Sequence, residues 1–137
     1  MPKLYFYDTG LACALLGITS DEQVKTHYLR GGLFEAMILA DLMKQKFNRG
    51  ELPNLFFWRD QHGHEVDCIV EQKKQPLPIE IKAGKTISSD YFEGLAYWNA
   101  LSKKKLAHGL VVYGGKEKQT RDKGHAIGWR DLPSFFA

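Results

Sequence analysis

The stretch HEVDCIVEQKKQPLPIEIKAG, residues 64–84, decides the expected architecture. Apolar and polar residues alternate in it, which predicts two strands, 64–72 and 77–83, around a turn at 73–76. In a strand, alternate residues share a face, so Glu80 and Lys82 point the same way. The stretch therefore places an acid and a base side by side on one face of a sheet.

The flanking segments supply the other elements of one domain. NLFFWRD predicts a strand that forms a hairpin with the stretch through the turn QHG. Capping residues and helical spacing predict short helices in DTGLACALLG and TSDEQV and a long helix in GGLFEAMILADLMKQKFNRG. After the stretch we expect a helix, a strand, a basic loop and a last strand, at 88–105, 108–115, 114–124 and 126–129.

The fold class follows from the order of these elements. A strand, a helix and a second apolar strand predict a right-handed crossover between parallel strands. Pro78 has no N–H and belongs at a strand start or on a free edge. We therefore expect an α/β fold, an α-β-β-β-α-β sandwich around a mixed sheet. A helical lead-in at 1–30 would precede a core at 31–137.

Composition limits the class of protein. The chain has 137 residues, 44% of them hydrophobic and 26% charged, which suits a single globular domain. Its net charge of +3 is compatible with a polyanionic partner. No run approaches the roughly 18 apolar residues of a membrane span, and no signal peptide is evident. We expect a cytoplasmic protein in which Cys13 and Cys68 are buried thiols.

The carboxylates of the predicted sheet indicate a metal site. Asp67 lies in the neighbouring strand and can face Glu80, while Glu35 lies beside the apolar stripe of the long helix. Carboxylates that converge repel each other, and a divalent cation removes that cost. Mg²⁺ prefers such hard oxygen ligands and can stabilise charge on a phosphodiester. Lys82 would hold or deprotonate water, or offset the developing charge.

These residues carry a resemblance to a known superfamily. EVD followed by EIK, after a helical glutamate, resembles the PD-(D/E)XK nucleases and their restriction-endonuclease-like fold. KLYFYDTGLACALLG, GGLFEAMILADL, FFWRDQHGHEVDCIVE and PIEIKAG together look like the uncharacterised C-terminal domain of prokaryotic AAA+-type ATPases. The resemblance spans residues 3–84, and its first motif reads EVD where the superfamily has PD.

The resemblance implies a magnesium- or manganese-dependent nuclease that acts on DNA. Asp67 and Glu80 match its metal-binding acids, the Ile81 carbonyl would be a third ligand, and Lys82 matches the catalytic lysine. Glu35 matches a helical acid that completes the site. An ATPase and a winged-helix region would be the partners, preceding this domain in a longer protein. The chain lacks GxxxxGK[ST] and so has no ATP site of its own.

Other interpretations remain open at this stage. Glu65 shares the strand face of Asp67 and is the rival ligand, whereas His62 and His64 are expected to be solvent-facing turn residues. The basic loop at 114–124 is a candidate phosphate contact. The domain could also be a non-catalytic nucleic-acid-binding or regulatory module of the ATPase. A third interpretation is an assembly domain that forms a homo-oligomer.

Overall fold

The computed structural model describes residues 3–72, 75–103 and 108–136. A six-stranded mixed sheet with the order β1-β2-β3-β4-β6-β5 forms its centre. The strands are β1 (Leu55–Arg59), β2 (Glu65–Val70), β3 (Leu77–Lys82), β4 (Leu110–Tyr113), β5 (Gln119–Arg121) and β6 (Gly124–Gly128). The three N-terminal strands form an antiparallel meander, and β3, β4 and β6 run parallel. The expected α/β class with a mixed sheet is confirmed.

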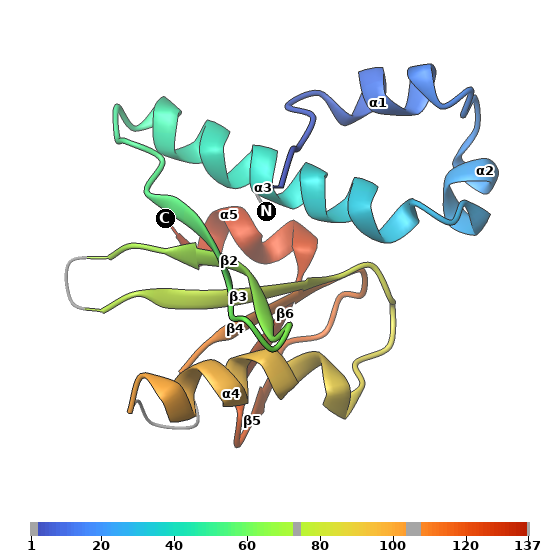
Figure 1. The fold of residues 1–137 in the computed structure, drawn as a ribbon. Coiled ribbons are helices and arrows are strands. Elements are labelled where there is room, and N and C mark those ends of the chain that lie inside the picture. Colours follow the sequence, from blue (N-terminus) through green and yellow to red (C-terminus); the bar gives the residue numbers. More distant parts are fainter. Residues whose placement is uncertain (1–2, 73–74, 104–107, 137) are drawn as a thin grey trace.

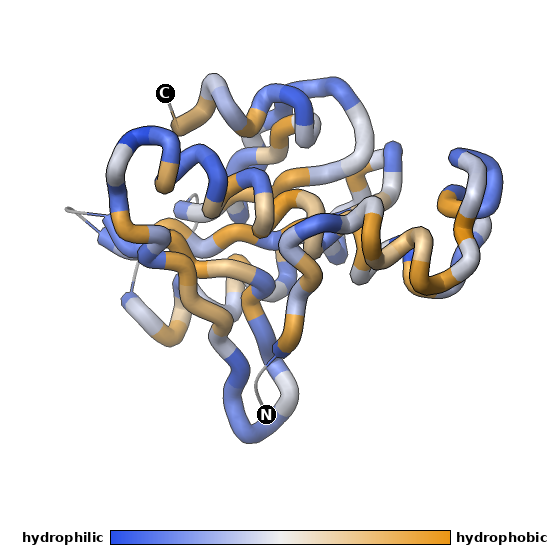
Figure 2. The backbone as a smooth tube through the Cα atoms, turned by 90° about the horizontal axis from the view of Figure 1, so that it is seen from above, coloured by the Kyte–Doolittle hydropathy of each residue, from blue (hydrophilic) through white to orange (hydrophobic). Residues whose placement is uncertain are grey.

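Helices cover both faces of the sheet (Figure 1). On one face lie α3 (Arg30–Asn48) and α5 (Leu132–Phe135), and on the other lies α4 (Glu93–Leu101). The short helices α1 (Thr9–Leu15) and α2 (Asp21–Thr26) extend to one side, as a view from above shows (Figure 2). Two 3₁₀ turns, η1 (Ser89–Phe92) and η2 (Trp129–Asp131), lead into α4 and α5.

Two apolar clusters hold the layers together. The larger joins α3 and α5 to alternate strand residues, among them Ile79, Ile81 and Leu110. The smaller joins η1 and α4 to Val111, Tyr113 and Ala126 on the opposite face. Because β4 is buried on both faces, its run LVVY is apolar throughout. The same alternation places Glu80 on the face that α4 covers.

The chain reverses and crosses over as its sequence predicts. The β1–β2 hairpin forms, and α4 connects β3 to the parallel strand β4. Pro78 stands second in β3, before the pairing with β4 begins at Ile79, so its missing N–H breaks no bond between these two strands. The predicted helix at 88–105 is η1 followed by α4, and residues 104–105 lie outside the described part of the chain.

One predicted loop is a strand. Part of the basic segment 114–124, Gln119–Arg121, forms β5 and pairs antiparallel with β6. Three polar residues are too few to show the period-two pattern of a half-buried strand. The preceding turn is anchored because the Tyr113 hydroxyl accepts from the Glu117 N–H at 2.9 Å and donates to the Glu117 carbonyl at 3.0 Å.

Both cysteines are free thiols. Neither Cys13 nor Cys68 forms a disulfide, and Cys68 is buried. Burial raises the pKa of the Cys68 thiol to about 12, so this thiol stays protonated. Cys13 is only half-buried.

Among the described residues, no helix combines the length and hydrophobicity needed to cross a membrane.

Candidate functional site

The central strands bring three of the predicted site residues together. Lys82 Nζ lies 2.7 Å from Glu80 Oε2 and 3.7 Å from Asp67 Oδ2. Both carboxylates are buried, with 4% of Glu80 and 7% of Asp67 exposed, while Lys82 keeps a third of its side chain in solvent. Buried charges need partners. Asp67, Glu80 and Lys82 thus form one compact ionic group, which we call the central ionic group.

The Asp67 side chain also accepts a hydrogen bond from the backbone of β3, at a position where the β2–β3 pairing has ended. The pairing of β2 with β3 ends at Cys68 and Ile79, and beyond it the Ile81 N–H donates to Asp67 Oδ2 at 2.8 Å. The N–H and C=O of one strand residue point to the same side. The Ile81 carbonyl therefore faces β2 and the Asp67 carboxylate. This is the backbone group that the resemblance implies as a third ligand.

The start of α4 closes over Glu80. A Cβ at Gly94 would lie 2.1 Å from Glu80 Oε1 and 2.9 Å from the Glu65 carbonyl. Glycine is therefore the residue that lets the helix approach so closely. This contact explains why a carboxylate on a strand face is shielded from solvent.

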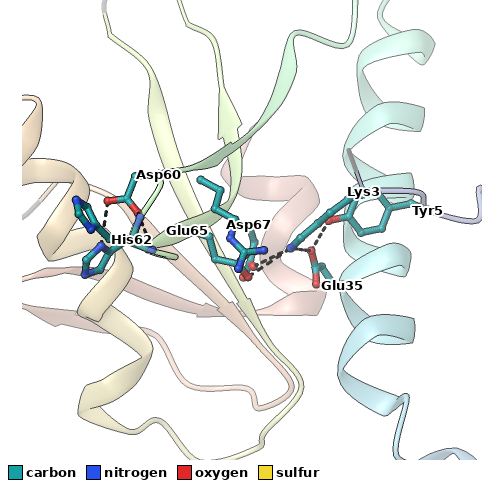
Figure 3. A network of polar contacts seen from close by, with 9 residues as sticks. Lys3, Tyr5, Glu35, Asp60, His62, Glu65 and Asp67 are labelled. Carbon is teal, nitrogen blue, oxygen red and sulfur yellow. Dashed lines mark hydrogen bonds and ion pairs between the residues drawn. The ribbon is translucent and has the colours of Figure 1, made fainter. Parts of the chain in front are cut away.

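A second ionic group extends from Asp67 to α3 (Figure 3). Lys3 Nζ lies 3.3 Å from Glu35, 3.5 Å from Glu65 and 4.0 Å from Asp67. The Tyr5 hydroxyl donates to Glu35 at 2.5 Å. Glu35 thus has the partners that its half-buried place predicts, and it reaches Asp67 through Lys3. Glu65, the rival ligand, belongs to this second group.

The protonation states follow from burial and charge. Burial, and next the charge of Asp67, raise the pKa of Glu80 to about 8 despite the ion pair with Lys82. Burial acts to lower the pKa of Lys82, but the charges of Asp67 and Glu80 outweigh it and raise that pKa. Burial and the hydrogen bond to Glu35 raise the pKa of Tyr5. Lys82 is held as an ammonium ion and Tyr5 as a neutral phenol.

The donor atoms suit a hard divalent cation with an incomplete protein shell. Asp67 and Glu80 offer carboxylate oxygens, and repulsion between them already disfavours two negative charges. Within the described residues, no group of three or more His, Cys, Asp or Glu side chains is placed to hold a metal. Mg²⁺ commonly binds through one or two carboxylates and completes its shell with water and phosphate oxygens. The residues present fit that mode of binding.

The β1–β2 turn is organised separately. Asp60 accepts from the backbone N–H groups of His62 and His64 at 2.8 and 2.9 Å, and from the Tyr97 hydroxyl at 2.8 Å. The His64 ring stacks on Tyr97 at 3.8 Å. Both histidines are exposed, as expected, and Asp60 stabilises the hairpin through these hydrogen bonds. These contacts link the turn to α4.

The protonation of Glu80 predicts a pH-dependent stability. Its pKa is raised from 4.5 to about 8 on folding, so the folded state binds the proton more tightly. The stability that this group contributes is complete below pH 4.5 and is lost as the pH rises through about 8. We expect the melting temperature of the wild type, measured in EDTA, to fall across this window more than that of Glu80→Gln. Parallel profiles for the two proteins would contradict the assignment.

Sequence reasoning missed Lys3 and Tyr5. They lie in an extended segment before α1, and their contacts with Glu35 and Glu65 span 30 to 62 residues of sequence. The alternation of Lys3 and Tyr5 with the apolar Leu4 and Phe6 is a local signal of an extended segment. It does not indicate which carboxylates the Lys3 and Tyr5 side chains meet.

Comparisons with known proteins give a family and two relatives. The family model described as "Domain of unknown function (DUF4143)" matches residues 30–132. The uncharacterized proteins Mb2031c of Mycobacterium bovis and Rv2008c of Mycobacterium tuberculosis are each 32% identical over 118 residues. The match covers 85% of this chain and 25% of each relative, so the chain spans about a quarter of their length. No solved structure matches.

Proposed function

The chain belongs to the DUF4143 family, and from its central ionic group we propose that it is a divalent-metal-dependent nuclease that acts on DNA. The observation that carries the proposal is the convergence of Asp67, Glu80 and Lys82 on one buried face. We further propose that the mixed sheet with flanking helices is the restriction-endonuclease-like core of the PD-(D/E)XK superfamily. In a longer protein this core would follow an ATPase and a winged-helix region.

Each residue has a role in this proposal. Asp67, Glu80 and the Ile81 carbonyl would hold Mg²⁺ or Mn²⁺, which when bound supplies Lewis-acid stabilisation of a phosphodiester oxygen. In hydrolysis, water adds to phosphorus, a P–O bond breaks, and the leaving oxygen gains the proton that water loses. The raised pKa of Lys82 favours an ammonium that offsets developing negative charge over a base that takes up a proton. Glu35 would position Lys3 and Tyr5 beside Asp67.

A second function is supported by a different observation. Lys82 pairs with Glu80 and Asp67, and Lys3 pairs with Glu35 and Asp67. Such internal pairing suits a non-catalytic module of the larger protein that binds nucleic acid or regulates the ATPase. This alternative predicts no metal-dependent behaviour of the chain.

Metal titration by calorimetry separates the two functions. We expect Mg²⁺ and Mn²⁺ to bind the wild type and not the Asp67→Asn/Glu80→Gln variant, because the variant lacks both carboxylate charges. Glu71→Gln/Asp122→Asn removes two exposed carboxylates and should bind like the wild type. Cleavage of plasmid, single-stranded DNA and RNA would be followed with the same three proteins.

Two outcomes of these measurements decide between the nuclease and the binding module. Metal-dependent cleavage by the wild type and the control, lost in the site variant, supports the nuclease. Absence of both metal binding and cleavage with every nucleic acid would overturn it and leave the binding module as the better account.

A further inference from the structure

A separate basic pocket lies where the parallel strands end. The segments that follow β3, β4 and β6 line an open cavity of about 720 Å³. Lys85 and Thr86 follow β3, Gly115 and Lys116 follow β4, and Arg130 follows β6. We call this cavity the strand-end pocket. In open α/β sheets, ligands bind outside the carboxyl ends of the strands.

The charge of the strand-end pocket is unbalanced. Lys85, Lys116 and Arg130 come from three different segments, and in the described part of the chain none forms an ion pair with a carboxylate. One acid, Glu117, lines the pocket, and its carboxylate accepts from the Gln119 amide at 3.3 Å. The nearby Asp131 is offset by Lys118 at 3.7 Å. The pocket therefore presents three cations against one acid.

Close backbone packing fixes the loops that carry these cations. A Cβ at Gly115 would lie 2.5 Å from the Lys85 carbonyl, and one at Gly128 would lie 2.5 Å from the Gly115 carbonyl. Arg130 is further held over the Trp129 ring at 4.2 Å. A rigid frame reduces the entropy lost when a ligand binds. The cations are thus presented from a preformed surface.

We propose that the strand-end pocket binds the phosphate group of a nucleotide, either free or within a nucleic-acid strand. A guanidinium and two ammonium groups suit an anion that carries several acceptor oxygens, and phosphate is such an anion. Thr86, whose side chain carries a neutral donor, lines the same pocket. The cavity volume lies in the range typical of small-molecule sites, which leaves room for more than one phosphate. Phosphate binding in the strand-end pocket does not depend on whether the central ionic group cleaves DNA.

Binding is tested in EDTA, so that no cleavage intervenes. Anisotropy of a fluorescein-labelled oligothymidylate and calorimetry with pyrophosphate, thymidine monophosphate and thymidine are the measurements. Lys116→Gln/Arg130→Gln should weaken binding of the phosphate-bearing probes about tenfold or more. The control Lys25→Gln/Lys44→Gln loses the same charge at exposed positions outside the pocket and should stay near the wild type. Thymidine, which lacks phosphate, should not bind.

The probes also distinguish the two sources of phosphate. If the monophosphate and pyrophosphate bind in a pocket-dependent way, the ligand is a free nucleotide; if the oligonucleotide alone does, it is a strand phosphate. In the second case the slope of log K against log salt concentration should fall by about 1.4 in the pocket variant, because two cations are lost and each contributes about 0.7 on a single strand. Lys85→Gln, which leaves the other two cations in place, provides an independent variant.

Two results would overturn the proposal. One is an equal loss of binding in the pocket variant and the control, which would indicate general attraction. The other is failure of every phosphate-bearing probe to bind the wild type. Because Asp67→Asn/Glu80→Gln should retain phosphate binding in EDTA, failure of the pocket and failure of the nuclease remain distinguishable.

Discussion

Lys82→Met should lower the free energy of unfolding by about 3 kcal/mol, which is the lower end of the range for breaking a buried ion pair. Its ammonium lies 2.7 Å from Glu80, whose side chain is 5% exposed, and 3.7 Å from Asp67. Methionine keeps the apolar stem and removes the charge, so two carboxylates remain buried without this partner. A third of the Lys82 side chain is exposed, and solvent there moderates the loss.

The matched control is Lys118→Met. This lysine also pairs with a carboxylate, Asp131 at 3.7 Å, but 64% of its side chain is exposed. Exposed pairs contribute about 0–1 kcal/mol, so the control should change stability little. Denaturant unfolding in EDTA at pH 9, above the pKa of about 8 that Glu80 has beside Lys82, gives both values.

A second substitution tests the cause of the loss. Glu80→Gln in the Lys82→Met background removes one of the buried charges and should recover most of the stability. Mg²⁺ should likewise stabilise Lys82→Met if the two carboxylates hold the ion. A small loss in Lys82→Met, or no recovery in the double variant, would show that the carboxylates stay protonated or hydrated without the lysine.

The strand pattern carried most of the prediction of the fold. Period-two alternation in residues 64–84 and the apolar run of β4 located the centre of the sheet, because strands buried on one or both faces have distinct patterns. Sequence patterns could not locate β5 or α5, which have three and four residues. Elements this short depend on contacts with the rest of the fold more than on their own sequence.

The candidate site was predictable where strand geometry alone brings residues together. Asp67, Glu80 and Lys82 meet because neighbouring strands align and alternate residues share a face. Lys3 and Tyr5 meet Glu35 and Glu65 only because the chain before α1 passes along α3, which no local pattern specifies. Likewise, the cations of the strand-end pocket come from three segments that are far apart in the sequence.

Gly114→Ala should lower the free energy of unfolding by about 3 kcal/mol, the upper end of the usual range for overpacking. A Cβ there would lie 2.5 Å from the Ala83 carbonyl and 3.1 Å from the Gly84 carbonyl, both of them backbone atoms. The Gly114 N–H donates to the Lys82 carbonyl at 3.1 Å and to the Gly84 carbonyl at 2.9 Å. The ends of β3 and β4 therefore cannot separate to admit a methyl group without losing these bonds.

Gly31→Ala is the control for this substitution. Gly31 lies in the first turn of α3, and nothing lies within 4 Å of the position its Cβ would take. Alanine there should stabilise the protein by up to about 1 kcal/mol, because it favours the helix. Denaturation midpoints compared at equal m-values measure the contrast. If the two variants differed by less than about 1 kcal/mol, the strand ends would be loose enough to move apart. The three cations of the strand-end pocket would then lack the rigid frame that phosphate binding requires.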